Sequence, residues 1–108
     1  MVNLKLRIVG ITCTPPILES VTEDSAMVFR FVWNYDGVDY SSDNTTSAQV
    51  LYSINGGSTF NAAAPALSYP NTETVIDLTE VPAEIFQFKI HLLNRTCDED
   101  SNIINYSI

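Results

Sequence analysis

The sequence predicts an all-β protein, a two-sheet antiparallel β-sandwich of about seven strands. Three observations predict this fold class. Between Phe86 and Leu92 apolar and polar residues alternate, as they do in a strand with one buried face. Turn-forming residues such as Asn55-Gly56-Gly57 separate short apolar segments. No segment carries the apolar repeat of an amphipathic helix. Because 45% of the 108 residues are hydrophobic, we expect one domain, residues 1–108, around one core.

The first strand has two candidates in the sequence. Leu4–Ile11 largely alternates between apolar and polar residues, and Ile17–Val21 follows a pair of prolines. If Ile17–Val21 is the first strand of the sandwich, residues 1–13 hold an additional strand or arm, formed by residues 2–12. That segment then pairs either with an edge of the chain's own sheet or with the sheet of a neighbouring subunit.

The middle of the chain predicts two further strands joined by a polar loop. Ala26–Trp33 is almost wholly apolar, which is typical of a strand packed on both faces. Asn34–Thr46 contains three aspartates and the pair Asp36-Gly37, so it predicts a loop. Ala48–Ile54 is again strand-like, and after the Asn-Gly-Gly turn we expect Ser58–Asn61 to return as a short strand.

The C-terminal part of the chain predicts three more strands. Ala62–Asn71 contains two prolines and is expected to be a crossing loop. Glu73–Leu78 alternates, and Phe86–Asn94 is the clearest alternating segment of the chain. Asn102–Ile108 is expected to supply the last strand.

Several residues between Pro15 and Ile108 form a recurring motif of one sandwich family. A proline pair precedes the first strand, Trp33 ends the second, and Tyr52 lies in the third. The later part of the motif is a leucine, a proline-containing turn, and an alternating strand that begins with an aromatic residue and ends in asparagine. Its residues are Leu78, Pro82, Phe86, Phe88, Ile90 and Asn94. In this order and spacing the chain resembles the fibronectin type III domain, an immunoglobulin-like β-sandwich.

The chain departs from that family at Phe86, where the family normally has a tyrosine. Because phenylalanine has no hydroxyl for the hydrogen bond of the tyrosine corner, we expect an apolar corner. No Arg-Gly-Asp triplet is present, so the resemblance does not imply integrin binding of the well-known kind. The resemblance bears on the fold more than on function, since this sandwich hosts many unrelated roles.

The two cysteines, Cys13 and Cys97, leave two interpretations open. The chain carries no recognisable signal peptide, so two free thiols are favoured. If Ile17–Val21 is the first strand, however, Cys13 lies near Cys97, and a disulfide would contribute ~4–5 kcal/mol in the chain-entropy model. If Leu4–Ile11 is the first strand, the two cysteines lie at opposite ends and no bridge can form.

Charge and hydropathy argue against several partners and compartments. The formal net charge of −8 disfavours binding to nucleic acid or to an anionic membrane surface. Lys5 and Arg7 interrupt the apolar start of the chain, so it does not read as a secretory signal. No apolar stretch approaches the ~20 residues that cross a bilayer. We therefore expect synthesis in the cytosol, no membrane partner and no nucleic-acid partner.

The sequence offers little raw material for catalysis. His91 is the only histidine, and the alternation places it with Lys89 on the polar face of its strand. No Ser–His or Cys–His pair at a useful spacing and no glycine-rich phosphate loop is apparent. Two cysteines and one histidine are too few for a zinc site. We therefore predict that the chain is not an enzyme and needs no cofactor.

Candidate binding residues gather in two loops expected at the same end of the sandwich. The aspartates of Asn34–Thr46 and of the turn after Phe86–Asn94 offer oxygen ligands for Ca²⁺, but their spacing matches no EF-hand, so solvated loop charge is favoured and no metal site is predicted. Loop tyrosines stack on sugars or anchor an interface when exposed, and otherwise they cap the core. The candidate residues are Tyr35, Asp36, Asp39, Tyr40, Asp98, Glu99 and Asp100, with Asp43 and Tyr69 beside them.

The sequence therefore predicts a non-enzymatic structural or interaction domain whose partners are proteins, contacted through edge strands or residues 2–12. Short acidic domains of this type look similar to accessory subunits of tailed bacteriophage virions, either capsid-decorating or tail-associated. That analogy makes the virion the expected location. Two alternatives remain: a carbohydrate- or receptor-binding module that uses the candidate loops, and a domain excised from a longer cell-surface protein.

Overall fold

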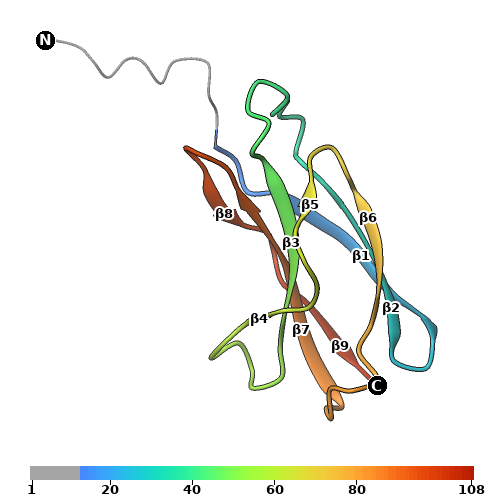
Figure 1. Cartoon of the computed structure of the whole chain (residues 1–108). Coiled ribbons are helices and arrows are strands. Elements are labelled where there is room, and N and C mark those ends of the chain that lie inside the picture. The colour runs from blue at the N-terminus through green and yellow to red at the C-terminus, as the bar shows by residue number, and fades with distance from the viewer. Residues whose placement is uncertain (1–12) are drawn as a thin grey trace, which may run out of the picture.

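The computed structural model describes residues 13–108, which form two antiparallel sheets and, within that range, no helix (Figure 1). The first sheet has the order β1-β2-β6, and its strands are β1 (Ile17–Ser25), β2 (Val28–Asn34) and β6 (Glu73–Asp77). The second sheet has the order β4-β3-β7-β8, with β5 also paired to β3 and β9 to β7. Its strands are β3 (Ser47–Ser53), β4 (Asn61–Ala62), β5 (Leu67–Ser68), β7 (Ile85–Leu93), β8 (Asp98–Asp100) and β9 (Ile104–Ser107).

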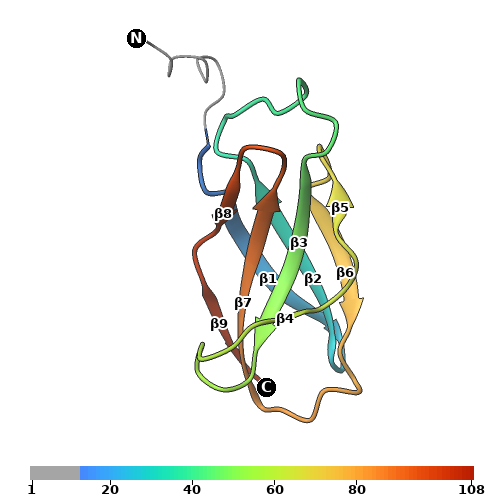
Figure 2. The ribbon, with the colours of Figure 1, turned by 60° about the vertical axis from the view of Figure 1, so that its left-hand side comes forward.

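The two sheets form two layers, and Figure 2 shows β3 and β7 lying in front of β1 and β2. The prediction of an all-β, two-sheet antiparallel protein is therefore confirmed. Within residues 13–108 no helix is long and apolar enough to cross a bilayer. The predicted arm of residues 2–12 and the alternative strand Leu4–Ile11 lie outside the described residues.

The first strand of the sandwich is the segment that follows the proline pair. β1 begins at Ile17, as in the predicted candidate Ile17–Val21, and continues to Ser25. The predicted second strand began at Ala26, but β2 begins at Val28 because Met27 adopts a positive φ of 61° in the connecting turn. The Met27 amide donates to Glu23 Oε2 at 2.8 Å, which fixes that turn. The turn is tighter than the sequence suggested because it uses an apolar residue in a left-handed conformation.

The core lies between β2 of one sheet and β7 of the other. Phe86, Phe88, Ile90 and Leu92 are all fully buried, so the predicted alternation of β7 is confirmed. The ring of Phe88 packs on Phe31 with centroids 4.9 Å apart. Phe86 stacks on Phe88 at 5.3 Å, which makes this corner of the sandwich apolar. Burial of large aromatic side chains from both sheets therefore holds the two layers together.

The segment between β3 and β6 contains more pairing than the sequence indicated. The Asn55-Gly56-Gly57 turn is present, with positive φ at both glycines. The return strand β4 is Asn61–Ala62 rather than Ser58–Asn61, and β5 lies within the predicted crossing loop. Both pair with β3, so this segment runs along one edge of the second sheet.

The segment between β8 and β9 is joined to β1 of the opposite sheet by the side chain of Asn102. Asn102 Oδ1 accepts from the Leu18 amide at 2.9 Å, and Asn102 Nδ2 donates to the Leu18 carbonyl at 3.1 Å. The Asn102 side-chain amide thus binds both backbone groups of Leu18, as a neighbouring strand would. It covers one edge of the first sheet near Leu18, whereas the other edge, β6, has no such cover in the described residues.

Candidate functional site

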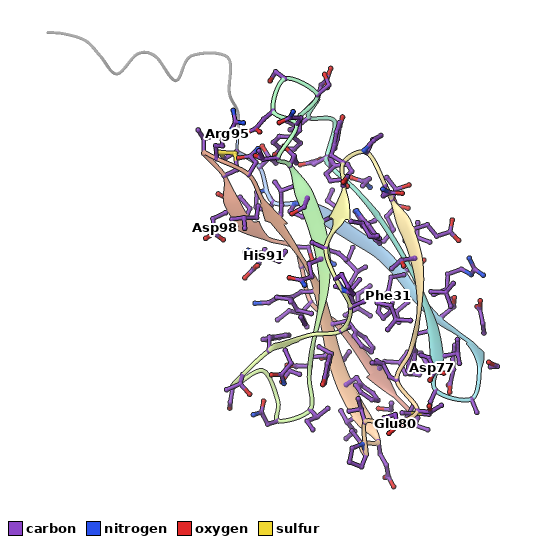
Figure 3. The ribbon with its side chains drawn as sticks, in the orientation of Figure 1. Phe31, Asp77, Glu80, His91, Arg95 and Asp98 are labelled. Carbon is purple, nitrogen blue, oxygen red and sulfur yellow. A yellow bond between two sulfur atoms is a disulfide. The ribbon has the colours of Figure 1, made fainter. Side chains whose placement is uncertain are left out.

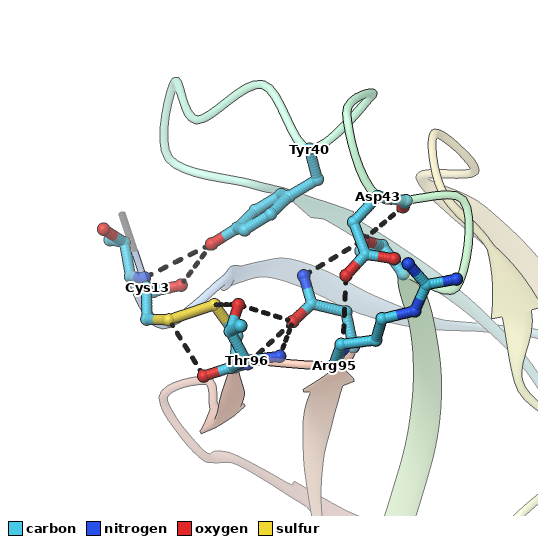
Figure 4. The surroundings of a disulfide bond; sticks show 9 residues. Cys13, Tyr40, Asp43, Arg95 and Thr96 are labelled. Atoms are coloured by element: carbon cyan, nitrogen blue, oxygen red, sulfur yellow. Dashed lines mark hydrogen bonds between the residues drawn. A yellow bond between two sulfur atoms is a disulfide. The ribbon is translucent and has the colours of Figure 1, made fainter. Parts of the chain in front are cut away.

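A disulfide bond fixes one end of the sandwich. Cys13 and Cys97 are bonded, with Cα atoms 5.4 Å apart (Figure 4), so the prediction of two free thiols is wrong. The physical reason is the strand register. Because β1 begins at Ile17, Cys13 comes just before it, at the end of the sheet where the β7–β8 turn carries Cys97. This pairing is the one expected if Ile17–Val21 belongs to the first strand.

Hydrogen bonds join the disulfide to the loop between β2 and β3 (Figure 4). The Thr14 amide donates to the Tyr40 hydroxyl and that hydroxyl donates to the Thr14 carbonyl, each at 3.2 Å. Asn94 Oδ1 accepts from the Cys97 amide at 2.6 Å, while its Nδ2 donates to Thr46 Oγ1 at 3.1 Å. The segment before β1, the β2–β3 loop and the β7–β8 turn are therefore one connected unit, which we call the loop end.

The tyrosines of the loop end form a packed cluster rather than an exposed surface. Tyr35 and Tyr69 lie edge to face with centroids 4.7 Å apart, and Tyr40 meets Tyr69 at 5.8 Å. Tyr35 is only 7% exposed and Tyr40 only 4%. Burial raises the pKa of Tyr35, and a hydrogen bond from Trp33 opposes that rise. The alternative in which the tyrosines cap the core is therefore the one observed, and Tyr35 and Tyr40 are not free to stack on a ligand.

The aspartates of the β2–β3 loop stabilise its turns. Asp39 Oδ1 accepts from the Ser41 amide and Asp43 Oδ1 from the Thr45 amide, both at 2.9 Å. Hydrogen bonds from these serine and threonine residues lower the pKa of both carboxyl groups. Asp36 occupies a turn position with a positive φ of 55°. Within residues 13–108 no group of three His, Cys, Asp or Glu side chains is placed to hold a metal ion, so these acids do not converge on a calcium site.

Asp98, Glu99 and Asp100 form a strand, so their prediction as a solvated loop tip is wrong. They make up β8, which pairs with His91–Leu93 of β7. Lys89 Nζ lies 2.8 Å from Asp100 Oδ2, and His91 Nδ1 lies 2.7 Å from Asp100 Oδ1. The signal in the sequence was the spacing: Lys89 and His91, two residues apart on one strand, match carboxylates two residues apart on the next.

The single histidine, His91, lies between two of these carboxylates. The second ring nitrogen, His91 Nε2, lies 3.3 Å from Asp98 Oδ1, and Figure 3 shows both side chains on the outer side of the β7–β8 pair. The polar-face position predicted for His91 is confirmed. Burial raises the pKa of Asp100, but hydrogen bonds from Lys89 and His91 outweigh that effect and the pKa is lowered. In the described residues both ring nitrogens face carboxylates rather than a hydroxyl or thiol nucleophile.

A small pocket lies beside the tyrosine cluster. Its volume is about 280 Å³. Asn44 and Pro70 are exposed at its mouth, while the mostly buried Tyr40 ring and the half-buried Tyr69 ring form part of its wall. The full lining is Tyr40, Ser41, Asp43, Asn44, Thr46, Tyr69 and Pro70. Of the tyrosines predicted from the sequence to contact a ligand, only Tyr69 is placed to do so with an appreciable part of its ring.

The second feature of the surface is the outer edge of β6, which pairs only with β2. The Trp33 amide donates to the Thr72 carbonyl at 2.9 Å and the Leu78 amide donates to the Met27 carbonyl at 2.8 Å. These bonds set the phase of the ladder, because hydrogen-bonded and non-hydrogen-bonded pairs alternate in an antiparallel sheet. Thr74 and Ile76 therefore bond to β2, and Glu73, Val75 and Asp77 direct their amides and carbonyls away from it.

This edge is a row of three residues with unpaired backbone groups in the part of the chain that the structure describes. Val75 lies at its centre and is 44% exposed. Glu73 and Asp77 lie on either side of Val75 on the same face. The strand itself was predicted from the sequence but its edge position was not, since that position depends on which strand becomes its neighbour. We call this row, Glu73, Val75 and Asp77, the β6 edge.

No family model matches the chain, and no curated protein is similar enough in sequence to be a recognisable relative. The loop end and the β6 edge are therefore the two features of the chain that bear on its function.

Proposed function

We propose that the chain is a non-catalytic interaction domain of the fibronectin type III kind, built into a larger protein assembly. In its most specific form the proposal is an accessory subunit of a bacteriophage virion, either capsid-decorating or tail-associated. The strand arrangement is compatible with that family: the first, second and sixth strands make one sheet, and the long β7 lies at the centre of the other. Trp33 and Phe88 occupy the core positions on which the resemblance was based.

The observation that carries the proposal is the β6 edge. An unpaired edge is a template for another strand, and charged side chains along the edge restrict which strands can pair with it. The opposite edge of the same sheet is covered near Leu18 by Asn102. At β6 the charged Glu73 and Asp77 flank the apolar Val75 and leave its backbone groups accessible. This arrangement suits strand addition by a partner that carries the complementary side chains.

A second candidate function is saccharide binding in the loop-end pocket, and the pocket itself is the observation in its favour. Tyr69 and Pro70 offer apolar surface for the C–H face of a sugar, and the exposed Asn44 amide offers hydrogen bonds to hydroxyl groups. The disulfide and the Asp43 turn hold the loop in place, so the pocket is formed before a ligand arrives. Saccharide binding ranks second because the tyrosine rings pack mainly against one another, which leaves little ring surface for a sugar.

The test is the incorporation of a β6-edge variant into the native assembly. Val75→Pro removes the outward amide without removing any bond to β2, so the fold is expected to survive. The wild type and the matched control Val75→Thr, which keeps the amide, are expected at a fixed integer stoichiometry in purified assemblies. Val75→Pro is expected at about one tenth of that stoichiometry or less, because the proline removes one or two hydrogen bonds to the partner strand and its ring clashes with that strand.

The readout is quantitative mass spectrometry of assemblies purified from the source, with circular dichroism of each free variant to verify its fold. A chain that occurs only outside stoichiometric complexes would contradict the proposal. Glycan binding that Tyr69→Ala abolishes, together with unchanged incorporation of Val75→Pro, would favour the second candidate instead.

A further inference from the structure

We propose that the β6 edge binds an extended segment of a different protein that is basic on one face and apolar on the other. This inference rests on the proposed function and adds the chemistry of the partner. β6 lies at the side of the molecule, with β2 on one flank and its other flank without a paired strand in the described residues (Figure 1). The partner therefore needs about five residues in extended conformation to span it.

The inward positions of the partner strand are expected to be apolar. Residues that pair across two strands share a face of the sheet. The partner residues beside Thr74 and Ile76 therefore face the layer between the sheets, where Ile76 is 7% exposed and Thr74 is half-buried. Leu67 of β5, at the edge of the second sheet, packs against the same core. Apolar side chains at these positions extend the core, whereas polar ones there are desolvated without a partner.

The outward positions are expected to be basic. Glu73 and Asp77 flank Val75 on the outer face, and hydrogen bonds from the Thr79 amide and hydroxyl lower the pKa of Asp77, which keeps it ionised. Figure 3 shows Asp77 and Glu80 together at the lower end of β6. One cation, Arg30, lies opposite Val75 on β2, and its guanidinium already pairs with Glu73 and with Asp24. Acidic groups thus outnumber basic ones along this edge.

The same charges disfavour the β6 strand of a second copy of the chain as the partner. If two β6 strands paired antiparallel about Val75, Glu73 of one copy would lie opposite Asp77 of the other at both ends. Like charges directly opposite each other destabilise a strand pair. The net charge of −8 adds a general repulsion between copies. A basic strand of another protein places Lys or Arg beside both acids and an apolar residue beside Val75.

The test uses two synthetic peptides and the full chain. The peptide Thr-Lys-Ile-Val-Ile-Lys-Thr presents lysines beside Glu73 and Asp77, and Thr-Glu-Ile-Val-Ile-Glu-Thr is its charge-reversed counterpart. Binding is measured by fluorescence anisotropy, and the site is read from the amide NMR shifts of β6. We expect only the lysine peptide to bind, with shifts centred on Val75, and its affinity to fall as salt rises.

Variants separate the backbone part of the interaction from the charged part. Val75→Pro is expected to weaken the lysine peptide about five-fold or more through lost backbone hydrogen bonds, and Val75→Thr is expected to leave it unchanged. Asp77→Asn is expected to weaken binding about two-fold at low salt and to reduce the salt dependence. Asp36→Asn is the matched control, since it removes the same charge at the other end of the molecule, where asparagine tolerates the positive φ.

Each other result overturns a stated part of the inference. Equal binding of both peptides, still lost in Val75→Pro, removes the basic partner and leaves docking at the edge intact. A concentration-dependent dimer that Val75→Pro dissolves identifies a second copy as the occupant. A third result is that neither peptide changes the amide NMR shifts of β6, while incorporation into the native assembly still requires the Val75 amide. In that case the proposed partner chemistry is wrong and the proposed function stands.

Discussion

Replacement of Cys13 and Cys97 by serine is expected to lower the free energy of unfolding by about 4–5 kcal/mol. The bridge spans a sequence separation of 84 residues, so it removes much of the conformational freedom of the unfolded chain. It also holds Thr14 where its backbone exchanges hydrogen bonds with Tyr40. The measurement is urea unfolding of the wild type and the double variant under non-reducing conditions, followed by intrinsic fluorescence.

The control for this prediction is the single variant Cys97→Ser, which loses the bridge and keeps one thiol. It is expected to lose about as much stability as the double variant, since the entropic effect belongs to the bridge and not to either sulfur. A loss below about 1 kcal/mol in the double variant, or two reactive thiols in the native wild type, would show that the folded protein does not depend on this bond.

Phe88→Ala is expected to lower the free energy of unfolding by about 3–5 kcal/mol. Phe88 is fully buried at the centre of the core, and its ring meets Phe29 at 5.4 Å and Phe31 at 4.9 Å, both from the opposite sheet. Truncation removes the apolar surface that joins the two layers and leaves a cavity between rigid strands. Urea unfolding of this variant gives the loss directly.

Phe60→Ala is the matched control, because it makes the same substitution outside the core. Phe60 is half-buried, and its ring lies under the ammonium group of Lys89, 4.1 Å from the ring centroid. Such a cation–π contact contributes about 0.5–1 kcal/mol at an exposed site, so the expected loss is small. Similar losses for the two variants would contradict the placement of Phe88 between the sheets.

The features that the sequence predicted are those that depend on one segment at a time. The alternation from Phe86 to Leu92 predicted both a strand and its buried face, because one face of a strand recurs at every second residue. Asn55-Gly56-Gly57 predicted a turn for a similarly local reason, the positive φ that glycine accepts. The two-sheet fold class followed from such local patterns.

The features that it did not predict depend on how segments combine. β8 is three acidic residues with no apolar alternation, and it becomes a strand only because His91–Leu93 offer it backbone partners and the side chains of Lys89 and His91 bind Asp100. The disulfide depended on the register of β1, which the sequence left open between two segments. Tyr40 looked like a loop residue, and its burial depends on contacts with Thr14 and Tyr69.

The proposed protein interactions all require the free edge of β6, and residue-resolved amide hydrogen exchange tests that edge most directly. In the isolated chain we predict an alternating pattern: the amides of Thr74 and Ile76 are protected by β2, and those of Glu73, Val75 and Asp77 exchange at least about tenfold faster. Uniform protection along β6 would contradict a free edge, because it would mean that the outward amides already have partners.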